Sequence, residues 1–229
     1  TKALLKTAEI KHILSNAKEF GLIINNNKDD WHKIVERSRN VADKLSKGVK
    51  YLLDKNKIDI IKGEGKLSGV GRVIVKNNEK KSIYSAPNII LATGARPKSI
   101  KGLEHDGKYI WSYKEAMIPD EKPDSLLIVG AGAIGIEFAS FYNDFGTNVT
   151  VIEAQEHILS SEDIEISVFA KNSLEKDGIK IFNKTKIVNF KPNKNGILAQ
   201  FVDAEGNKLE EKFSRVIMAI GIESNIENI

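Results

Sequence analysis

Apolar residues near the start of the chain recur every three or four positions, which is the spacing of one helix face. The first such stretch runs from Ala3 to Ala17 and predicts a helix that ends near Gly21. A second, longer stripe follows Asp29 and Asp30, either of which can cap a helix. Its members are Trp31, Ile34, Val35, Val41, Ala42, Leu45, Val49, Leu52 and Leu53. The pattern therefore predicts two helices at the start of the chain.

The spacing then changes to short apolar runs bounded by turn residues, which is typical of β-strands. Residues 58–61, 73–75, 83–84 and 89–91 form such runs. Asn77-Asn78 lies between the middle two and predicts a hairpin there. Two prolines within residues 117–125 make that segment the best candidate for a linker.

Beyond residue 125 strand-like and helix-like segments alternate. We expect strands at 126–129, 149–152 and 179–182, separated by helices at 134–145 and 163–176. Turn signals at Asn195-Gly196 and Glu205-Gly206 then predict antiparallel strands, followed by a last strand at 216–220. Alternating strands and helices form a parallel sheet with helices on both faces. The predicted fold class is therefore α/β.

Composition excludes several kinds of chemistry. The 229 residues contain no cysteine, so this chain forms no disulfide and has no cysteine nucleophile or Cys-ligated metal. The net charge of +4 comes mainly from scattered lysines, whereas nucleic-acid readers cluster arginine, so we expect no nucleic-acid partner. The four histidines lie far apart and predict no metal site. No apolar run is long enough to cross a bilayer.

One glycine-rich turn carries the strongest chemical signal. Gly130-Ala131-Gly132-Ala133-Ile134-Gly135 lies between a predicted strand and a predicted helix, and the next strand ends at Glu153. In a dinucleotide-binding turn the first glycine permits a tight bend, the second admits a diphosphate and the third lets helix and strand pack closely. The first helix amides attract the phosphates, and the acid accepts hydrogen bonds from the adenosine ribose. A glycine turn without a ligand is the alternative, but strand, helix and acid together favour a dinucleotide site.

Glu153 also bears on which dinucleotide is bound. Its carboxylate would repel a 2′-phosphate on the ribose, because two like charges about 4 Å apart cost on the order of 1 kcal/mol even in water. Residues 154–157 contain no arginine that could neutralise such a phosphate. The sequence therefore favours NAD over NADP.

Further segments resemble a known family. Glycine turns also follow predicted strands at Ala92-Thr93-Gly94-Ala95 and Ala219-Ile220-Gly221. Together with Thr1-Lys2-Ala3-Leu4-Leu5, the segment 130–137 and Val151-Ile152-Glu153, their order resembles the pyridine-nucleotide disulfide oxidoreductases. The resemblance covers the whole chain and is closest to the members that oxidise dihydrolipoamide, the flavoprotein components of 2-oxo acid dehydrogenase complexes. It implies two Rossmann-like domains, an incomplete FAD-binding domain at residues 1–118 and a nearly complete NAD-binding domain at residues 119–229.

The resemblance also implies roles for individual residues. Lys2 would lie beside the flavin N5 and pair with Glu137, which would neutralise it and border the nicotinamide. The other residues implied to contact FAD are Gly65, Thr93, Gly94 and Ala95. Those implied to contact NAD are Gly130, Ala131, Gly132, Ala133, Ile134, Gly135, Ile136, Glu137, Glu153, Ile187 and Gly221. From the residues alone, a solvated lysine, a surface glutamate, a plain turn at Gly65 and a core strand residue at Ile187 are the alternatives.

The sequence departs from the family pattern in what it lacks. The Cys-x4-Cys redox disulfide, the first and second FAD motifs and the dimerisation domain with its His–Glu acid/base pair have no counterpart here. We therefore expect this chain to hold the FAD-to-NAD portion and not to oxidise dihydrolipoamide by itself. The implied parent enzyme is a homodimer that serves lipoyl domains in the cytoplasm or mitochondrial matrix. The alternatives are a stand-alone NAD-binding or scaffolding module without redox activity, and another FAD/NAD(P) disulfide reductase.

Overall fold

The structure is a computed structural model that describes residues 1–24 and 28–229. These residues divide into two compact units. Unit 1 consists of residues 1–41 and 97–221, and unit 2 consists of residues 42–96 and 222–229. The boundary expected between residues 118 and 119 divides an FAD-binding domain from an NAD-binding domain, whereas the two units are groups of residues that pack together. The expected boundary therefore stays a prediction.

Unit 1 is built on a five-stranded sheet whose four strand pairings are all parallel. Helix α4 (Ala133–Asp144) connects β6 to β7, and helix α5 (Ile164–Lys176) connects β7 to β8. The sheet confirms the predicted α/β class with a parallel sheet. In spatial order its strands are β5 (Ile110–Trp111), β12 (Arg215–Met218), β6 (Ser125–Val129), β7 (Asn148–Ile152) and β8 (Lys180–Phe182).

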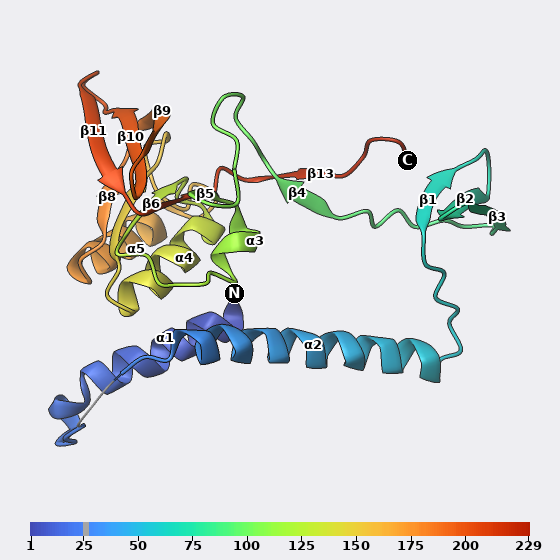
Figure 1. Cartoon of the computed structure of the whole chain (residues 1–229), viewed down its shortest axis with the longest axis horizontal. Helices are drawn as coiled ribbons and strands as arrows, with labels where there is room; N and C mark the ends of the chain where they lie inside the picture. Colours follow the sequence, from blue (N-terminus) through green and yellow to red (C-terminus); the bar gives the residue numbers. More distant parts are fainter. Residues whose placement is uncertain (25–27) are drawn as a thin grey trace. The chain divides into compact units, whose positions relative to one another are not determined.

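Side chains that alternate along the central strands fill two separate cores. In β6, Leu126 and Ile128 pack with α4 and with α1 (Lys2–Ser15), whereas Leu127 and Val129 pack with a second sheet. Figure 1 shows this second sheet on one side of the parallel sheet and α4 and α5 on the other. Both faces are therefore covered, and the carboxyl ends of the strands are left to form a site. The antiparallel second sheet contains β9 (Lys186–Asn193), β10 (Gly196–Val202) and β11 (Lys208–Phe213).

The first helices follow the sequence prediction closely. Helix α1 ends at Ser15, and a 3₁₀ helix (Ala17–Phe20) continues to Gly21, which has a left-handed φ of 74°. Helix α2 (Trp31–Lys55) is capped by Asp30, whose side chain accepts the Lys33 N–H at 3.1 Å. A short helix, α3 (Tyr113–Ala116), follows β5 and begins with a capping box.

Trp31 connects the start of α2 to the core of unit 1. Its ring centroid lies 5.6 Å from that of Phe141 and 5.5 Å from that of Phe145, both in or next to α4. Aromatic pairs at these separations add packing energy beyond the area they bury. The apolar stripe predicted from Trp31 onward thus begins as a partly buried contact with the core.

Unit 2 contains a three-stranded antiparallel sheet and a two-stranded one. The hairpin predicted at Asn77-Asn78 is confirmed, with Asn78 at a left-handed φ of 54°. In the same unit, Leu45 and Val49 of α2 are 68% and 58% exposed, so this part of the apolar stripe faces solvent. The strands of the two sheets are β1 (Glu64–Leu67), β2 (Arg72–Asn77), β3 (Lys80–Ser85), β4 (Ala95–Pro97) and β13 (Ile222–Ser224).

Three strand predictions are wrong or need correction. Residues 58–61 and 89–91 have no regular secondary structure, and the last strand of the parallel sheet ends at Met218 instead of Ile220. An apolar run reports which side chains favour burial, whereas a strand also needs a hydrogen-bonded neighbour. Ile58 and Ile60 accordingly remain about half exposed, at 52% and 49%.

Candidate dinucleotide-binding site

The turn between β6 and α4 can be made only with glycine at two of its positions. Gly130 has a φ of 102°, and a Cβ added there would lie 2.5 Å from the carbonyl oxygen of Ala219. A Cβ on Gly135 would collide with the carbonyl oxygen of Gly130. Both glycines therefore bring backbone into contact with backbone, as the sequence predicted for the tight turn and for the packing of helix on strand.

Gly132 is different, because the protein itself does not require a glycine there. Its backbone is extended, with φ −73° and ψ −178°, and no atom lies within 4 Å of an added Cβ. Helix α4 begins directly after Gly132 without a side-chain cap. The first amides of a helix lack intrahelical acceptors. Open space before uncapped amides is the arrangement that binds a phosphate group.

Glu153 directly follows β7, and hydrogen bonds hold it in place on several sides. Its Oε2 accepts the amide N–H of Ala131 at 2.7 Å, and its Oε1 accepts the amide N–H of Gln155 at 2.9 Å. Its own amide donates to the Phe182 carbonyl at 2.9 Å, and its carbonyl accepts from Thr185 at 2.9 Å. An ionised carboxylate has about four acceptor positions, so two remain for ribose hydroxyls.

A cleft of about 520 Å³ lies at the carboxyl ends of β6, β7 and β12, within unit 1. This is the edge at which parallel α/β sheets hold their ligands. Five of its lining residues are among those expected to contact NAD: Gly130, Gly132, Glu153, Ile187 and Gly221. The structure thus brings residues from four separate chain segments to one cleft.

The other residues expected to contact NAD lie at the start of α4, beside the cleft. Ala131 is fully buried and supplies its amide to Glu153. Ala133, Ile134, Gly135, Ile136 and Glu137 form the first turns of the helix. Whether they contact a cofactor stays a prediction.

The cleft also contains residues that sequence reasoning missed. Ala154 and Gln155 directly follow Glu153, and Ala219 and Ile220 precede Gly221, so their neighbours were a usable signal. Thr185 and Lys186 precede Ile187 and have the same kind of signal. Ile100 and Ser160 reach the cleft from loops and carry no local signal.

Lys2 and Glu137 lie together, as the family resemblance implies. The Nζ of Lys2 is 4.0 Å from Oε1 of Glu137, and the two side chains are 93% and 31% exposed. A pair this long and this exposed contributes little to stability. The Lys2 and Glu137 side chains are thus close together, and the position of this pair beside a flavin and a nicotinamide stays a prediction.

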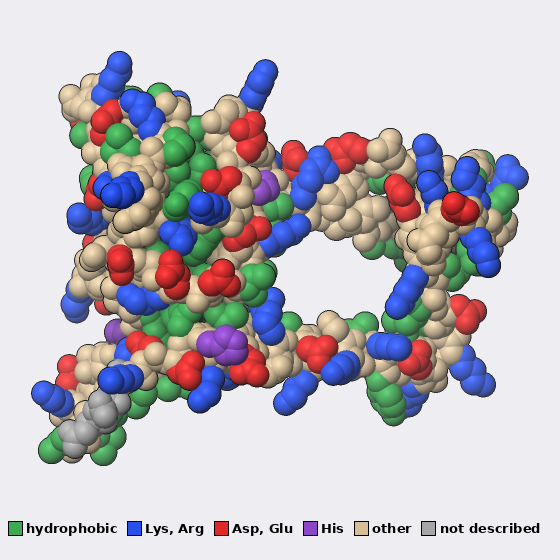
Figure 2. Space-filling model, viewed as in Figure 1, with side chains coloured by type: hydrophobic (Ala, Val, Ile, Leu, Met, Phe, Trp, Pro, Cys, Tyr) green, Lys and Arg blue, Asp and Glu red, His purple; other side chains and the backbone are tan. Residues whose placement is uncertain are grey.

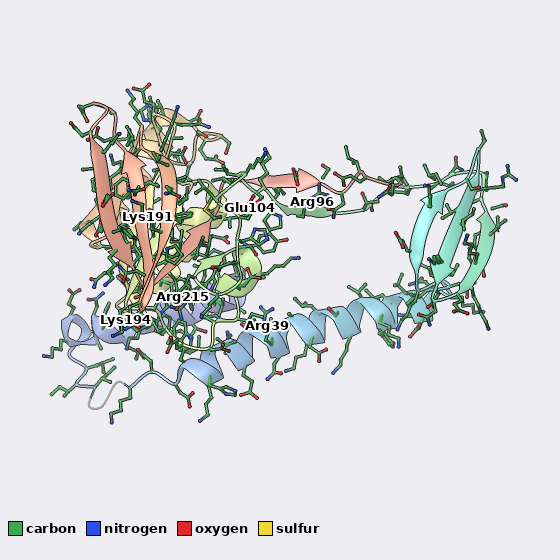
Figure 3. The ribbon with its side chains drawn as sticks, turned by 45° about the horizontal axis from the view of Figure 1, so that its top comes forward. Arg39, Arg96, Glu104, Lys191, Lys194 and Arg215 are labelled. Carbon is green, nitrogen blue, oxygen red and sulfur yellow. The ribbon has the colours of Figure 1, made fainter. Side chains whose placement is uncertain are left out.

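The residues of unit 2 that are expected to contact FAD lie in strands or form hydrogen bonds within the protein. Gly65 lies in β1 opposite Val75, so the plain turn considered for it is wrong. The Thr93 hydroxyl donates to the Asn225 carbonyl at 2.6 Å, and the Asn225 amide donates to Gly94 at 3.0 Å. Figure 3 labels Arg96 on β4, directly after Ala95. These contacts neither support nor contradict flavin binding, so the expected contacts with FAD stay predictions.

On the face shown in Figure 2, lysine and arginine side chains are interspersed with acidic ones. Among residues 1–24 and 28–229, no three His, Asp or Glu side chains are grouped so that they could hold a metal ion. Of the helices in the described part of the chain, none has the length and apolar character needed to cross a membrane.

A parallel sheet whose glycine-rich turn and strand-end carboxylate border an open cleft defines the class of dinucleotide-binding α/β proteins. The chain belongs to the pyridine nucleotide-disulphide oxidoreductase family, whose model matches residues 1–229.

Similar proteins agree with this assignment. Dihydrolipoyl dehydrogenase of Zymomonas mobilis is 43% identical over 230 residues, and that of Rhizobium etli is 42% identical over 245 residues. Each match covers all of this chain, which spans about half the length of these relatives. The crystal structure of LpdA from Mycobacterium tuberculosis matches 99% of the chain and 49% of that protein, with a TM-score of 0.87 at 24% identity. At that identity the structural match supports the fold alone.

Proposed function

We propose that the cleft of unit 1 binds NAD. The observation that carries this proposal is the open space at Gly132, next to uncapped helix amides and in the same cleft as the Glu153 carboxylate. The amides at the start of α4 would hold the diphosphate, and Glu153 would accept hydrogen bonds from the adenosine ribose. Ile187 would pack on the adenine, and Gly221 would leave room for the dinucleotide at the opposite wall.

We further infer that the chain forms the NAD-binding portion and part of the FAD domain of a dihydrolipoyl dehydrogenase, which would make the fold two Rossmann-like domains. The relatives of that name, at about 40% identity, support this inference. The whole reaction would convert dihydrolipoamide and NAD⁺ into lipoamide, NADH and a proton. Bound FAD would pass the two electrons between a redox disulfide and NAD⁺.

Because this chain has no cysteine, the redox disulfide has to come from residues other than these 229. Lys2 and Glu137 would border the reacting rings of the two cofactors. Lipoyl domains of 2-oxo acid dehydrogenase complexes are the proposed partners of the parent enzyme. A homodimer in the cytoplasm or the mitochondrial matrix is its proposed form.

Calorimetric titration of NADH into the 229-residue chain tests the first proposal. The Gly132→Ala variant should fold, because no atom lies within 4 Å of the added methyl, yet it should weaken NADH binding by about tenfold. Gly48→Ala is the matched control, since Gly48 also has open space around it but lies on α2, in unit 2. Absence of NADH uptake by the folded chain, or tighter binding of NADPH, would contradict the proposal.

Activity assays separate the enzyme from the simpler module. The chain alone should bind NADH without oxidising dihydrolipoamide, because it lacks the disulfide. Turnover of dihydrolipoamide by a clean preparation would show that the disulfide is not needed. Visible flavin absorption in the purified protein would favour the flavoprotein over an NAD-binding module without redox activity.

A further inference from the structure

Lys186 is a cationic residue that lines the cleft and has no role in the proposed function. It is the first residue of β9 and lines the cleft together with Glu153 and Ile187. Its side chain is exposed, and among the described residues its ammonium forms no ion pair within 4.0 Å. Lys184, two positions earlier, instead pairs with Glu156 at 2.7 Å.

Glu153, the acidic residue that lines the cleft, forms no ion pair with Lys186. The Glu153 carboxylate is hydrogen-bonded to the amides of Ala131 and Gln155, which keep it directed at the glycine-rich turn. The Lys186 ammonium therefore lies at the cleft without a carboxylate partner among the described residues. An unpaired cation in a concave site raises the local concentration of anions and strengthens their binding.

We propose that Lys186 binds a phosphate group of the dinucleotide, an inference that rests on the proposed function. Phosphates are the only anionic groups of such a ligand, and a lysine ammonium offers three donors on a flexible stem. Lys186 directly precedes Ile187, the residue proposed to pack on the adenine. Because the proposed ligand is NAD, which has no 2′-phosphate, the group that Lys186 binds is the 5′-diphosphate.

The experiment compares Lys186→Gln with Lys184→Gln in the full chain. Both substitutions remove one positive charge within three residues of each other, but only Lys186 lines the cleft. The probes are adenosine, 5′-ADP and 2′-AMP, titrated by calorimetry. Lys186→Gln should weaken the binding of 5′-ADP by about fivefold, the size of a favourable exposed charge pair, and leave the binding of adenosine unchanged. Lys184→Gln should change each affinity by less than about twofold.

Each outcome has a defined meaning. Weaker binding of 5′-ADP assigns Lys186 to the diphosphate and supports the proposal, whereas weaker binding of 2′-AMP alone assigns it to a 2′-phosphate, which NAD lacks, and overturns it. Lys186→Arg keeps the charge and should restore most of the affinity. Equal behaviour of the Lys186→Gln and Lys184→Gln variants, or an equal loss for adenosine, overturns it. If the wild-type chain binds none of the probes, the proposed function itself fails.

Discussion

The carboxylate of Glu153 accepts the amide N–H of Ala131 at 2.7 Å, so the end of β7 is hydrogen-bonded to the turn that follows β6. The two strands are parallel neighbours, and this bond joins their carboxyl ends. Glu153 therefore stabilises the glycine-rich turn in addition to the role proposed for it with the ribose. The same side chain links the stability of unit 1 to the chemistry of the cleft.

Glu153→Ala should lower the free energy of unfolding of unit 1 by about 2 kcal/mol, because two backbone amides lose a charged acceptor. Urea unfolding followed by circular dichroism measures this change. Glu156→Ala is the control, since the Glu156 side chain is 63% exposed and its pairing with Lys184 lies at the surface. That control should change stability by less than about 0.5 kcal/mol, and an equal loss in both variants would contradict the role of Glu153 in the turn.

Gly135→Ala should be strongly destabilising, by about 3 kcal/mol or more, because the new methyl collides with the Gly130 carbonyl. Gly132→Ala makes the same change three residues earlier in open space, and it should cost at most about 1 kcal/mol. Thermal unfolding of the two variants distinguishes a glycine needed for packing from one that keeps a ligand site open. Similar melting temperatures would show that α4 can move away from β6.

Asp144 predicts a pH dependence of stability. Burial raises the pKa of this carboxyl, and Asp177 raises it further, although His12 at 3.4 Å acts in the opposite direction. A raised pKa means that the folded state binds the proton more tightly than the unfolded state. The resulting stabilisation is therefore present below about pH 4 and is lost as the pH rises through the raised pKa.

Asp144→Asn removes this titration. The free energy of unfolding of the variant minus that of the wild type should be larger at pH 7 than at pH 4. Urea unfolding at both pH values measures this difference. Asp120→Asn, at an exposed position of unit 1, is the control and should show no such trend. A wild type that gains as much stability as the variant over this range would argue against the proposed cause.

Arg96 holds β13 and the residues after it against β4. Its guanidinium donates to both carboxylate oxygens of Glu227, at 2.7 and 2.6 Å, and to Glu223 at 2.7 Å. The hydrogen bonds from Arg96 lower the pKa of Glu227 to about 2. The stabilisation is thus present above the usual carboxyl pKa and is lost as the pH falls towards about 2.

Arg96→Gln should accelerate hydrogen exchange of the Asn225 amide, which donates to Gly94 next to this cluster. Exchange measured by mass spectrometry on the peptide that covers residues 222–229 tests this expectation. Arg72→Gln, on β2 of the same unit, is the charge-matched control. Unchanged exchange in the Arg96 variant would show that the backbone bonds hold this segment without the ion pairs.

Local sequence was a reliable guide where neighbouring residues decide the structure. The period of apolar residues predicted α1, α2, α4 and α5 but not the short α3. Asn77-Asn78 predicted a hairpin, and the glycine spacing predicted the turn at Gly130. The same reasoning failed at residues 58–61, where an apolar run suggested a strand that does not form. A strand depends on a partner that is distant in sequence, and side-chain periodicity carries no information about that partner.

The α/β class, the glycine-rich turn and the acid at the end of the following strand could be predicted from the amino-acid sequence, because each follows from spacing within one strand–helix–strand segment. Two relationships became visible only in the folded chain: Glu153 accepts a hydrogen bond from the Ala131 amide, and Lys186 lines the same cleft without an ion pair among the described residues. Those relationships depend on which strand ends meet at the sheet edge. Strand order and the packing of the second sheet set that meeting, and both arise from contacts between residues far apart in the chain.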